Sequence, residues 1–225
     1  MMILVFDLDD TLYDEMTFVR SGFSKVSEYL EKKYRVPPRE SFALMLNLLR
    51  QNGRGRVFND LLSNYGLSQG NIKKCLSIYR SHEPAISLYE EADDCLNRFK
   101  GIPKYIVTDG NKLVQENKIK ALNLGQRVKF SFITHRYGRI HSKPSPYCFF
   151  KICEKEKCLP QQVIYVADNP GKDFVGIKPF GFITVRVLTG QYRNVSAAKA
   201  YQADYSINSL SELTPGFVRS LARRI

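Results

Sequence analysis

The sequence predicts an α/β fold, a Rossmann-like core with a parallel sheet and an all-helical domain inserted after the first strand. From residue 84 onward, short apolar runs alternate with helix-like segments, the pattern that βαβ units around a parallel sheet produce. Between residues 15 and 83 the apolar residues recur at helical spacing instead. We therefore expect a catalytic core of residues 1–14 and 84–225 and a helical cap domain of residues 15–83.

The first strand is predicted by the run MILVF, which ends in the acidic turn DLDDT. A short apolar run followed by charged residues is typical of a buried strand that leads into a polar loop. After this turn, apolar residues recur at helical spacing from Val19 to Leu30, and Pro37 and Pro38 are expected to end that helix. Three further helices are predicted over residues 41–49, 57–64 and 72–81.

The remainder of the core is predicted as alternating helices and strands. The expected strands are the apolar runs KYIVT, FSFIT, QVIYVA, FITVRV and ADYSI. Helices are expected over residues 90–99 and 113–122, from Pro144, near Phe174, and from Ser209 to the end. In a parallel sheet the polar segments that follow the strands meet at one edge, so this edge is where a site is expected.

Composition places the chain among ordinary globular proteins. Hydrophobic residues make up 44% and charged residues 25% of its 225 residues, which argues against disordered and fibrous classes. No apolar run approaches the roughly 20 residues that span a bilayer, so no membrane association is expected. The five cysteines are scattered and odd in number, and no apolar leader with a basic start precedes the first strand. These features favour a reducing compartment, the cytoplasm.

The formal net charge of +12 raises the question of nucleic-acid binding. Basic residues are enriched between Lys100 and Lys143, yet no block of five consecutive like charges occurs. Nucleic acid is therefore a disfavoured partner. A generally positive field that attracts small anions is the favoured interpretation, and it agrees with a phosphorylated small-molecule substrate.

Chemistry-bearing side chains follow four of the predicted strands. Asp7 and Asp9 share the turn after the first strand; one carboxylate can attack phosphorus while the other protonates the leaving oxygen and then activates water. Thr108 and the backbone N–H of Asp109 end the strand KYIVT, where they could hold phosphoryl oxygens. Lys143 precedes a predicted helix, and its ammonium could neutralise nucleophile and phosphate together.

The fourth strand end carries a candidate metal site. Asp168 and Asp173 lie in VADNPGKD, directly after the strand QVIYVA. Carboxylate oxygens are the ligands that Mg²⁺ prefers in proteins. The four strand ends together would supply a nucleophile, an acid, a phosphate anchor, a counter-charge and metal ligands.

The order and spacing of these motifs resemble the signature of the haloacid dehalogenase superfamily: an Asp-x-Asp-x-Thr strand end, then a Thr or Ser, then a Lys, then an acidic pair. The resemblance covers nearly the whole chain, because the helical segment is similar to the cap of the capped members. It implies that Asp7 is the nucleophile and a magnesium ligand, and that Asp9 is the general acid/base whose backbone carbonyl also binds the metal. Asp168 would be the third protein ligand, and Asp173 would support the metal's water shell.

The same resemblance implies that Thr108 and the Asp109 N–H hold the phosphoryl group and that Lys143 bridges Asp7 and the phosphate. The dehalogenases of the superfamily lack an acid at the position of Asp9, whereas its phosphatases and phosphomutases keep one. Carbon–halogen chemistry is therefore disfavoured. Thr11 is expected to orient Asp9 through a hydrogen bond.

We accordingly expect a magnesium-dependent phosphatase that hydrolyses a small phosphate monoester, a sugar phosphate or a nucleoside monophosphate, through an aspartyl-phosphate. Arg54 and Arg56, in the loop NGRGR of the cap, are candidates for contacting an anionic part of the substrate. Two alternatives remain: a sugar-phosphate phosphomutase, which shares every catalytic residue, and a non-enzymatic basic binding module. The sequence leaves the physiological substrate, the oligomeric state and the role of the strong positive charge open.

Overall fold

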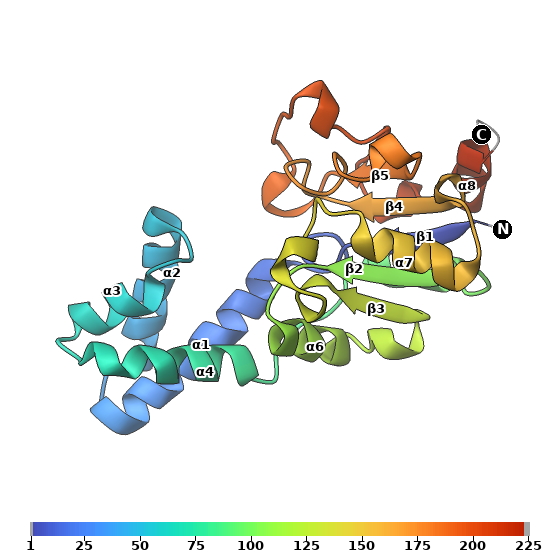
Figure 1. The fold of residues 1–225 in the computed structure, drawn as a ribbon. Helices are drawn as coiled ribbons and strands as arrows, with labels where there is room; N and C mark the ends of the chain where they lie inside the picture. The colour runs from blue at the N-terminus through green and yellow to red at the C-terminus, as the bar shows by residue number, and fades with distance from the viewer. Residues whose placement is uncertain (1, 223–225) are drawn as a thin grey trace. The chain divides into compact units, whose positions relative to one another are not determined.

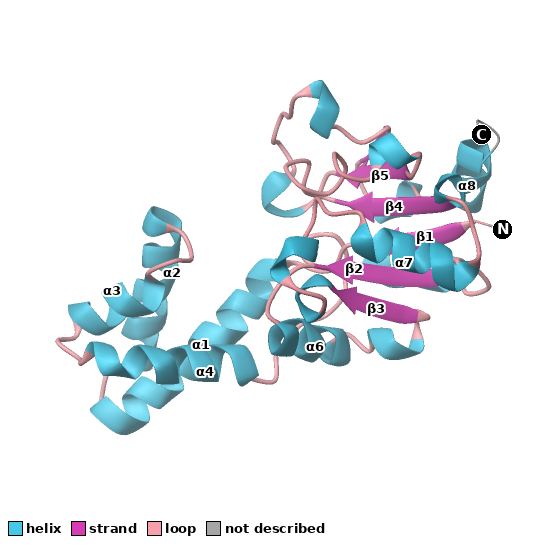
Figure 2. Ribbon diagram, viewed as in Figure 1, coloured by secondary structure: helices cyan, strands magenta, loops and turns pink. Residues whose placement is uncertain are grey.

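A computed structural model describes residues 2–222 and divides the chain into two compact units. One unit comprises Met1–Glu15 and Ser87–Ile225, and the other comprises Met16–Ile86. The first holds all the strands of the described residues in a single sheet, whereas residues 16–86 contain helices and no strand (Figures 1 and 2). The prediction of a parallel α/β fold with an all-helical insertion is confirmed.

The sheet has six strands in the order β3-β2-β1-β4-β5-β6, and every neighbouring pair is parallel. The central strands are buried on both faces, as expected where helices cover both sides of a parallel sheet. The chain places β2 and β3 on one side of β1 and the later strands on the other, so the order reverses between β1 and β4. The strands are β1 (Ile3–Phe6), β2 (Lys104–Thr108), β3 (Phe130–Ile133), β4 (Val163–Ala167), β5 (Ile183–Val187) and β6 (Tyr205–Ile207).

One face of the sheet packs on helix α7 (Tyr147–Glu156), which lies across it in Figure 1. Phe149 and Ile152 of this helix are fully buried against Val5 and Tyr165 of the sheet. Alternate strand residues point to each face, so the same strands bury a second set of side chains, including Leu4, on the opposite face. The other α-helices of this unit are α5 (Glu90–Arg98), α6 (Lys112–Ala121) and α8 (Pro215–Ala222).

The helical unit is built from α1 (Glu15–Tyr34), α2 (Pro38–Asn52), α3 (Val57–Asn64) and α4 (Ile72–Ser81). Its core is apolar: Phe23, Leu30, Met45 and Leu61 are among the residues buried there. Pro38 begins α2 instead of ending the preceding helix, a position at which the fixed φ of proline suits the first helical turn. No helix among the described residues is long and apolar enough to cross a bilayer.

The prediction of a helix near Phe174 is wrong. The described residues there form turns and a short 3-10 segment, Lys178–Phe180. Pro170 and Pro179 bracket the segment, and each removes a backbone donor that an α-helix would need. The connection between β4 and β5 is therefore a loop, and this loop carries part of the site.

Candidate active site

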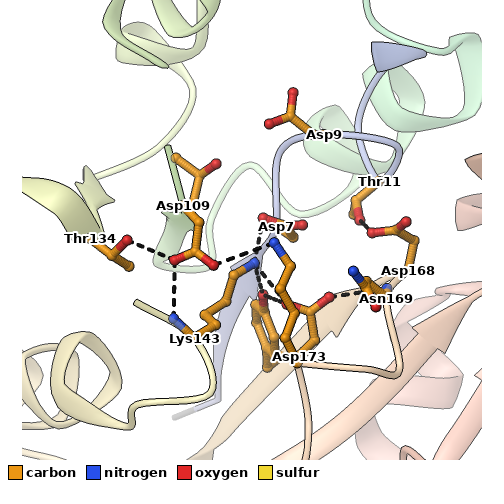
Figure 3. Close-up of polar contacts among 12 residues, drawn as sticks. Asp7, Asp9, Thr11, Asp109, Thr134, Lys143, Asp168, Asn169 and Asp173 are labelled. Carbon is orange, nitrogen blue, oxygen red and sulfur yellow. Dashed lines mark hydrogen bonds and ion pairs between the residues drawn. The ribbon is translucent and has the colours of Figure 1, made fainter. Parts of the chain in front are cut away.

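The candidate site lies at the carboxyl ends of β1, β2 and β4, around the point where the strand order reverses. Ligands bind at this place in open parallel sheets. Phe6 pairs with Val166 in the β1–β4 register, so Asp7 and Asp168, which follow these strands, emerge side by side. Together with Asp173 they form a cluster of buried carboxylates whose oxygens lie within 4.8 Å of one another. Figure 3 shows Asp7 and Asp173 on either side of Lys143 and Asp168 next to Thr11.

Lys143 supplies the positive charge inside this acidic cluster. Its Nζ atom lies 2.7 Å from Asp7 Oδ1 and 2.7 Å from Asp173 Oδ1, and its side chain is 1% exposed. The hydroxyl of Tyr165 lies 3.0 Å from the same ammonium and donates to Asp173. Burial by itself would lower the pKa of Lys143, but Asp173 and Asp7 raise it well above its ordinary value. Lys143 is therefore a permanent cation in the cluster.

The acidic cluster still carries excess negative charge. Burial, reinforced by Asp173, raises the pKa of Asp7 to about 6 despite the opposing effect of Lys143. Burial, then the charges of Asp7 and Asp173, raise the pKa of Asp168 to about 9. Crowded buried carboxylates need either protons or a cation, and this all-oxygen donor set suits a divalent ion such as Mg²⁺.

The three carboxylates differ in how far protein donors already engage them. Asp173 Oδ1 receives the Lys143 and Tyr165 donors, and its Oδ2 accepts the Asn169 N–H at 3.0 Å. Asp168 Oδ1 accepts a long hydrogen bond, 3.3 Å, from the Thr11 hydroxyl. Asp168 is thus better placed than Asp173 to give an oxygen directly to a metal.

Asp9 lies in different surroundings from Asp7, although only one residue separates them. Its Oδ1 is 2.6 Å from Lys118 Nζ and accepts the Tyr13 hydroxyl, and its Oδ2 accepts Gln115 Nε2 at 3.0 Å. Burial would raise the pKa of Asp9, but the Lys118 charge and these hydrogen bonds lower it below its usual value. The Asp9 side chain is directed away from Asp7 (Figure 3).

The expected hydrogen bond from Thr11 to Asp9 is wrong. Thr11 Oγ1 donates to Asp168 Oδ1 instead. The turn from Asp9 onward carries Thr11 toward β4, because Asp10 has a left-handed backbone with φ of 55°. Thr11 therefore orients a candidate metal ligand.

Thr108 and Asp109 end β2, but their side chains have separate partners. The Thr108 hydroxyl, 1% exposed, accepts Gln115 Nε2 at 2.6 Å. The Asp109 carboxylate accepts the Thr134 hydroxyl at 2.7 Å and the backbone N–H of Lys143 at 3.1 Å. It thereby ties the segment before Lys143 to the end of β2. Burial opposes ionisation of Asp109, but Lys143 and Lys172 hold its pKa below the usual value.

A glycine brings two loops of the site into close approach. A Cβ atom on Gly176 would lie 1.6 Å from the carbonyl oxygen of Pro144. Gly176 belongs to the loop that carries Asp168 and Asp173, and Pro144 follows Lys143. Only a residue without a side chain allows the two backbones to meet here.

The sequence analysis missed several polar residues of the site, among them Tyr165, Lys172, Gln115 and Lys118. Gln115 and Lys118 are three residues apart on α6, so they share one helix face, and their position just after the Thr108 strand end was a usable signal. Tyr165 lies inside an apolar strand, where nothing in the pattern distinguishes it from a core aromatic residue. Lys172 was not distinguished from other surface lysines.

The candidate specificity residues Arg54 and Arg56 lie in the helical unit, whereas all the residues above lie in the α/β unit. Arg56 forms an exposed ion pair with Asp60 at 3.4 Å. Arg54 lines a cavity of about 200 Å³ whose walls include Phe23 and Tyr79. The two arginines are separated by Gly55 alone, yet their side chains lie in different surroundings.

Curated relatives of this chain are archaeal and bacterial phosphatases. It is 27% identical over 226 residues to the glyceraldehyde 3-phosphate phosphatase of Methanocaldococcus jannaschii, covering 93% of this chain and 94% of that protein. It is 26% identical over 165 residues to the phosphoserine phosphatase of Thermus thermophilus, covering 72% of this chain and 64% of that protein.

Solved structures show the same fold. A 2-haloacid dehalogenase from Pseudomonas syringae superposes with a TM-score of 0.67 at 20% identity, covering 100% of both chains. A haloacid dehalogenase-type phosphatase from Thermococcus onnurineus gives a TM-score of 0.60 at 23% identity, covering 95% of this chain and 96% of that one. The family model of haloacid dehalogenase-like hydrolases matches residues 1–181. The chain therefore belongs to the haloacid dehalogenase-like hydrolases.

Proposed function

We propose that this hydrolase is a magnesium-dependent phosphatase of small phosphate monoesters, with Asp7 as its nucleophile. The observation that carries the proposal is the buried cluster in which Lys143 lies 2.7 Å from Asp7 beside the carboxylates of Asp168 and Asp173. A nucleophilic carboxylate attacking an anionic phosphoryl group needs positive charge on both partners. Lys143 supplies part of that positive charge. A metal ion held by the carboxylates of the acidic cluster would supply the rest.

Asp7, Asp168 and the backbone carbonyl of Asp9 are the proposed protein ligands of Mg²⁺, and Asp173 would act through Lys143 and the surrounding water. Bound Mg²⁺ would neutralise charge on the nucleophile and on the phosphoryl oxygens. Asp173 is assigned the indirect role because protein donors already occupy both of its oxygens.

The proposed reaction has two halves. An Asp7 oxygen attacks phosphorus, the bond from phosphorus to the ester oxygen breaks, and Asp9, after taking up a proton from solvent, gives that proton to the departing alcohol. Asp9 then removes a proton from water, which attacks the aspartyl-phosphate and releases inorganic phosphate and free Asp7. The Thr108 hydroxyl and the Asp109 N–H hold the phosphoryl oxygens, and Lys143 remains protonated throughout.

The relatives favour a small substrate, because their names specify glyceraldehyde 3-phosphate and phosphoserine. We therefore place three-carbon phosphates first among candidate substrates, with sugar phosphates and nucleoside monophosphates after them. Residues 15–83 are the proposed cap that selects the leaving group, and Arg54 and Arg56 are the candidates for contacting its anionic part; Arg56 pairs with Asp60 at 3.4 Å, and Arg54 lines a cavity of the helical unit. Cytoplasmic location and the absence of a nucleic-acid partner are part of the same proposal.

The test is phosphate release by the purified full chain from a panel of three-carbon, sugar and nucleoside monophosphates, with Mg²⁺ and with excess EDTA. Magnesium-dependent release from at least one monoester is expected, and replacing both Arg54 and Arg56 by Gln should alter the order of preference among the substrates. Interconversion of sugar phosphates with little free phosphate and a need for a bisphosphate activator would indicate a phosphomutase instead. No turnover of any monoester would contradict the proposal.

A further inference from the structure

Helix α6 presents two buried polar side chains to the site. Gln115 and Lys118, 1% and 3% exposed, lie three residues apart and so share one face of the helix. The start of the helix is fixed by Asn111, whose side chain accepts the backbone N–H groups of Leu113 and Val114. Lysine is rarely buried to this extent unless its charge is paired. Both side chains therefore require an explanation in terms of what they contact.

Lys118 contacts the proposed general acid/base directly. Its Nζ lies 2.6 Å from Asp9 Oδ1 and 3.8 Å from Glu15 Oε1. Tyr13 donates its hydroxyl to the same Asp9 oxygen. Charge-assisted bonds of this length are strong and directional, so they fix the rotamer of the Asp9 side chain. Figure 3 shows the Asp9 carboxylate apart from the acidic cluster of Asp7, Asp168 and Asp173.

Gln115 joins Asp9 to the phosphate-binding end of β2. A side-chain amide carries two N–H donors, and Gln115 Nε2 lies 3.0 Å from Asp9 Oδ2 and 2.6 Å from Thr108 Oγ1. Because Thr108 accepts this bond, its own hydroxyl proton is left to donate elsewhere. The Thr108 hydroxyl can then donate a hydrogen bond to a phosphoryl oxygen.

We propose that Lys118 and Gln115 are positioning residues for the phosphatase reaction: Lys118 sets the location of the Asp9 carboxylate, and Gln115 aligns both Asp9 and the Thr108 hydroxyl. This inference rests on the proposed function. Neither residue is assigned a contact with the substrate; each acts through Asp9 or Thr108, to which such contacts are assigned. Lys118 therefore governs the step that needs a proton on the leaving group, and Gln115 governs that step and phosphate binding together.

The test compares two leaving groups in single turnovers, so that only formation of the aspartyl-phosphate is followed. p-Nitrophenolate departs without a proton, whereas the alcohol of glycerol 3-phosphate needs one. Lys118→Met should slow release of glycerol at least about tenfold more than release of p-nitrophenol, within the range that general acid catalysis supplies. Gln115→Leu should show the same discrimination and also raise KM for both substrates.

Lys120→Met is the matched control, because Lys120 lies on the same helix but is exposed; it should leave both rates unchanged. Lys118→Arg keeps the charge and should recover part of the glycerol rate. Equal losses for both leaving groups in Lys118→Met would show a merely structural role and overturn the inference, as would no loss. If Lys118→Met does not fold, Lys118→Gln replaces it in the same comparison.

A crystal structure of Lys118→Gln gives a readout that is independent of activity. The Asp9 carboxylate is expected to leave its position beside Tyr13, and an unchanged Asp9 rotamer would overturn the positioning role. A wild-type protein that turns over no monoester with Mg²⁺ would instead refute the proposed function, and the Asp9 rotamer would still decide whether Lys118 positions it.

Discussion

Two regions of the site place an aspartate of the same turn in opposite electrostatic settings. Around Asp7, burial and neighbouring carboxylates raise its pKa to about 6, although Lys143 is in contact. Around Asp9, Lys118 and two neutral donors outweigh burial and lower its pKa. The difference teaches that neighbours, and not the turn itself, set the pKa values of the two acids in the metal-free protein. The acidic cluster is suited to a metal and a phosphate, whereas the Asp9 region is satisfied by the protein alone.

The largest expected effect is the loss of activity when the nucleophile Asp7 is replaced. Asp7→Asn keeps the size of the side chain but eliminates the attacking carboxylate, so we expect kcat to fall by about 10⁴-fold or more, the scale seen when a covalent nucleophile is lost. Phosphate release is measured with Mg²⁺, and circular dichroism verifies folding. Full magnesium-dependent activity in Asp7→Asn would refute the assignment of the nucleophile.

A smaller effect is expected on stability when the cluster loses its cation. Lys143→Met leaves Asp7 and Asp173 buried without their counter-charge, so the free energy of unfolding of the metal-free protein should fall by about 3–5 kcal/mol at pH 7. Urea denaturation measures the change. The control is Lys25→Met, whose ion pair with Glu28 is half exposed, with Lys25 50% and Glu28 53% exposed; it should change stability by about 0.5 kcal/mol or less. Equal effects of the two substitutions would contradict a stabilising role for Lys143.

A third prediction sharpens the comparison through pH. The folded pKa values of Asp168 and Asp7, about 9 and about 6, exceed the ordinary carboxyl value of 3.8. Between pH 3.8 and about 9 these carboxyls hold more protons in the folded protein than in the unfolded chain. The free energy of unfolding of the metal-free protein should therefore fall as pH rises from about 4 to about 9. Mg²⁺ should therefore raise Tm more at pH 8 than at pH 5.5.

The stabilisation by Mg²⁺ should reach about 2.7 kcal/mol at a hundredfold excess over Kd. Scanning fluorimetry in EDTA and in Mg²⁺ tests this, and Asp168→Asn should flatten the metal-free dependence. A magnesium effect that is the same at both pH values would count against a metal at the acidic cluster.

The sequence contained the parts of the site that follow strands. The turn after β1 and the segments after β2 and β4 were recognisable because apolar runs of strand length end in polar residues, and a parallel sheet brings these ends together. The helix expected near Phe174 does not form, because Pro170 and Pro179 each lack a backbone donor that an α-helix there would need.

Other features depend on contacts between segments distant in the chain. Lys118 lies 109 residues from Asp9, and Tyr165 lies 22 residues from Lys143. No local pattern reports such contacts. Thr11 was assigned to its neighbour Asp9, yet its hydroxyl bonds Asp168 across the sheet, so proximity in sequence gave the wrong partner.

The contact between Gly176 and Pro144 has a consequence for how the site can change over evolution. There is no room for a Cβ atom between the two backbones. The segment that carries Lys143 and the loop that carries Asp168 and Asp173 therefore pack in direct backbone contact. An insertion beside Gly176 or Pro144 would move the two backbones apart, and with them the Lys143 ammonium and the carboxylate of Asp173 that it pairs with.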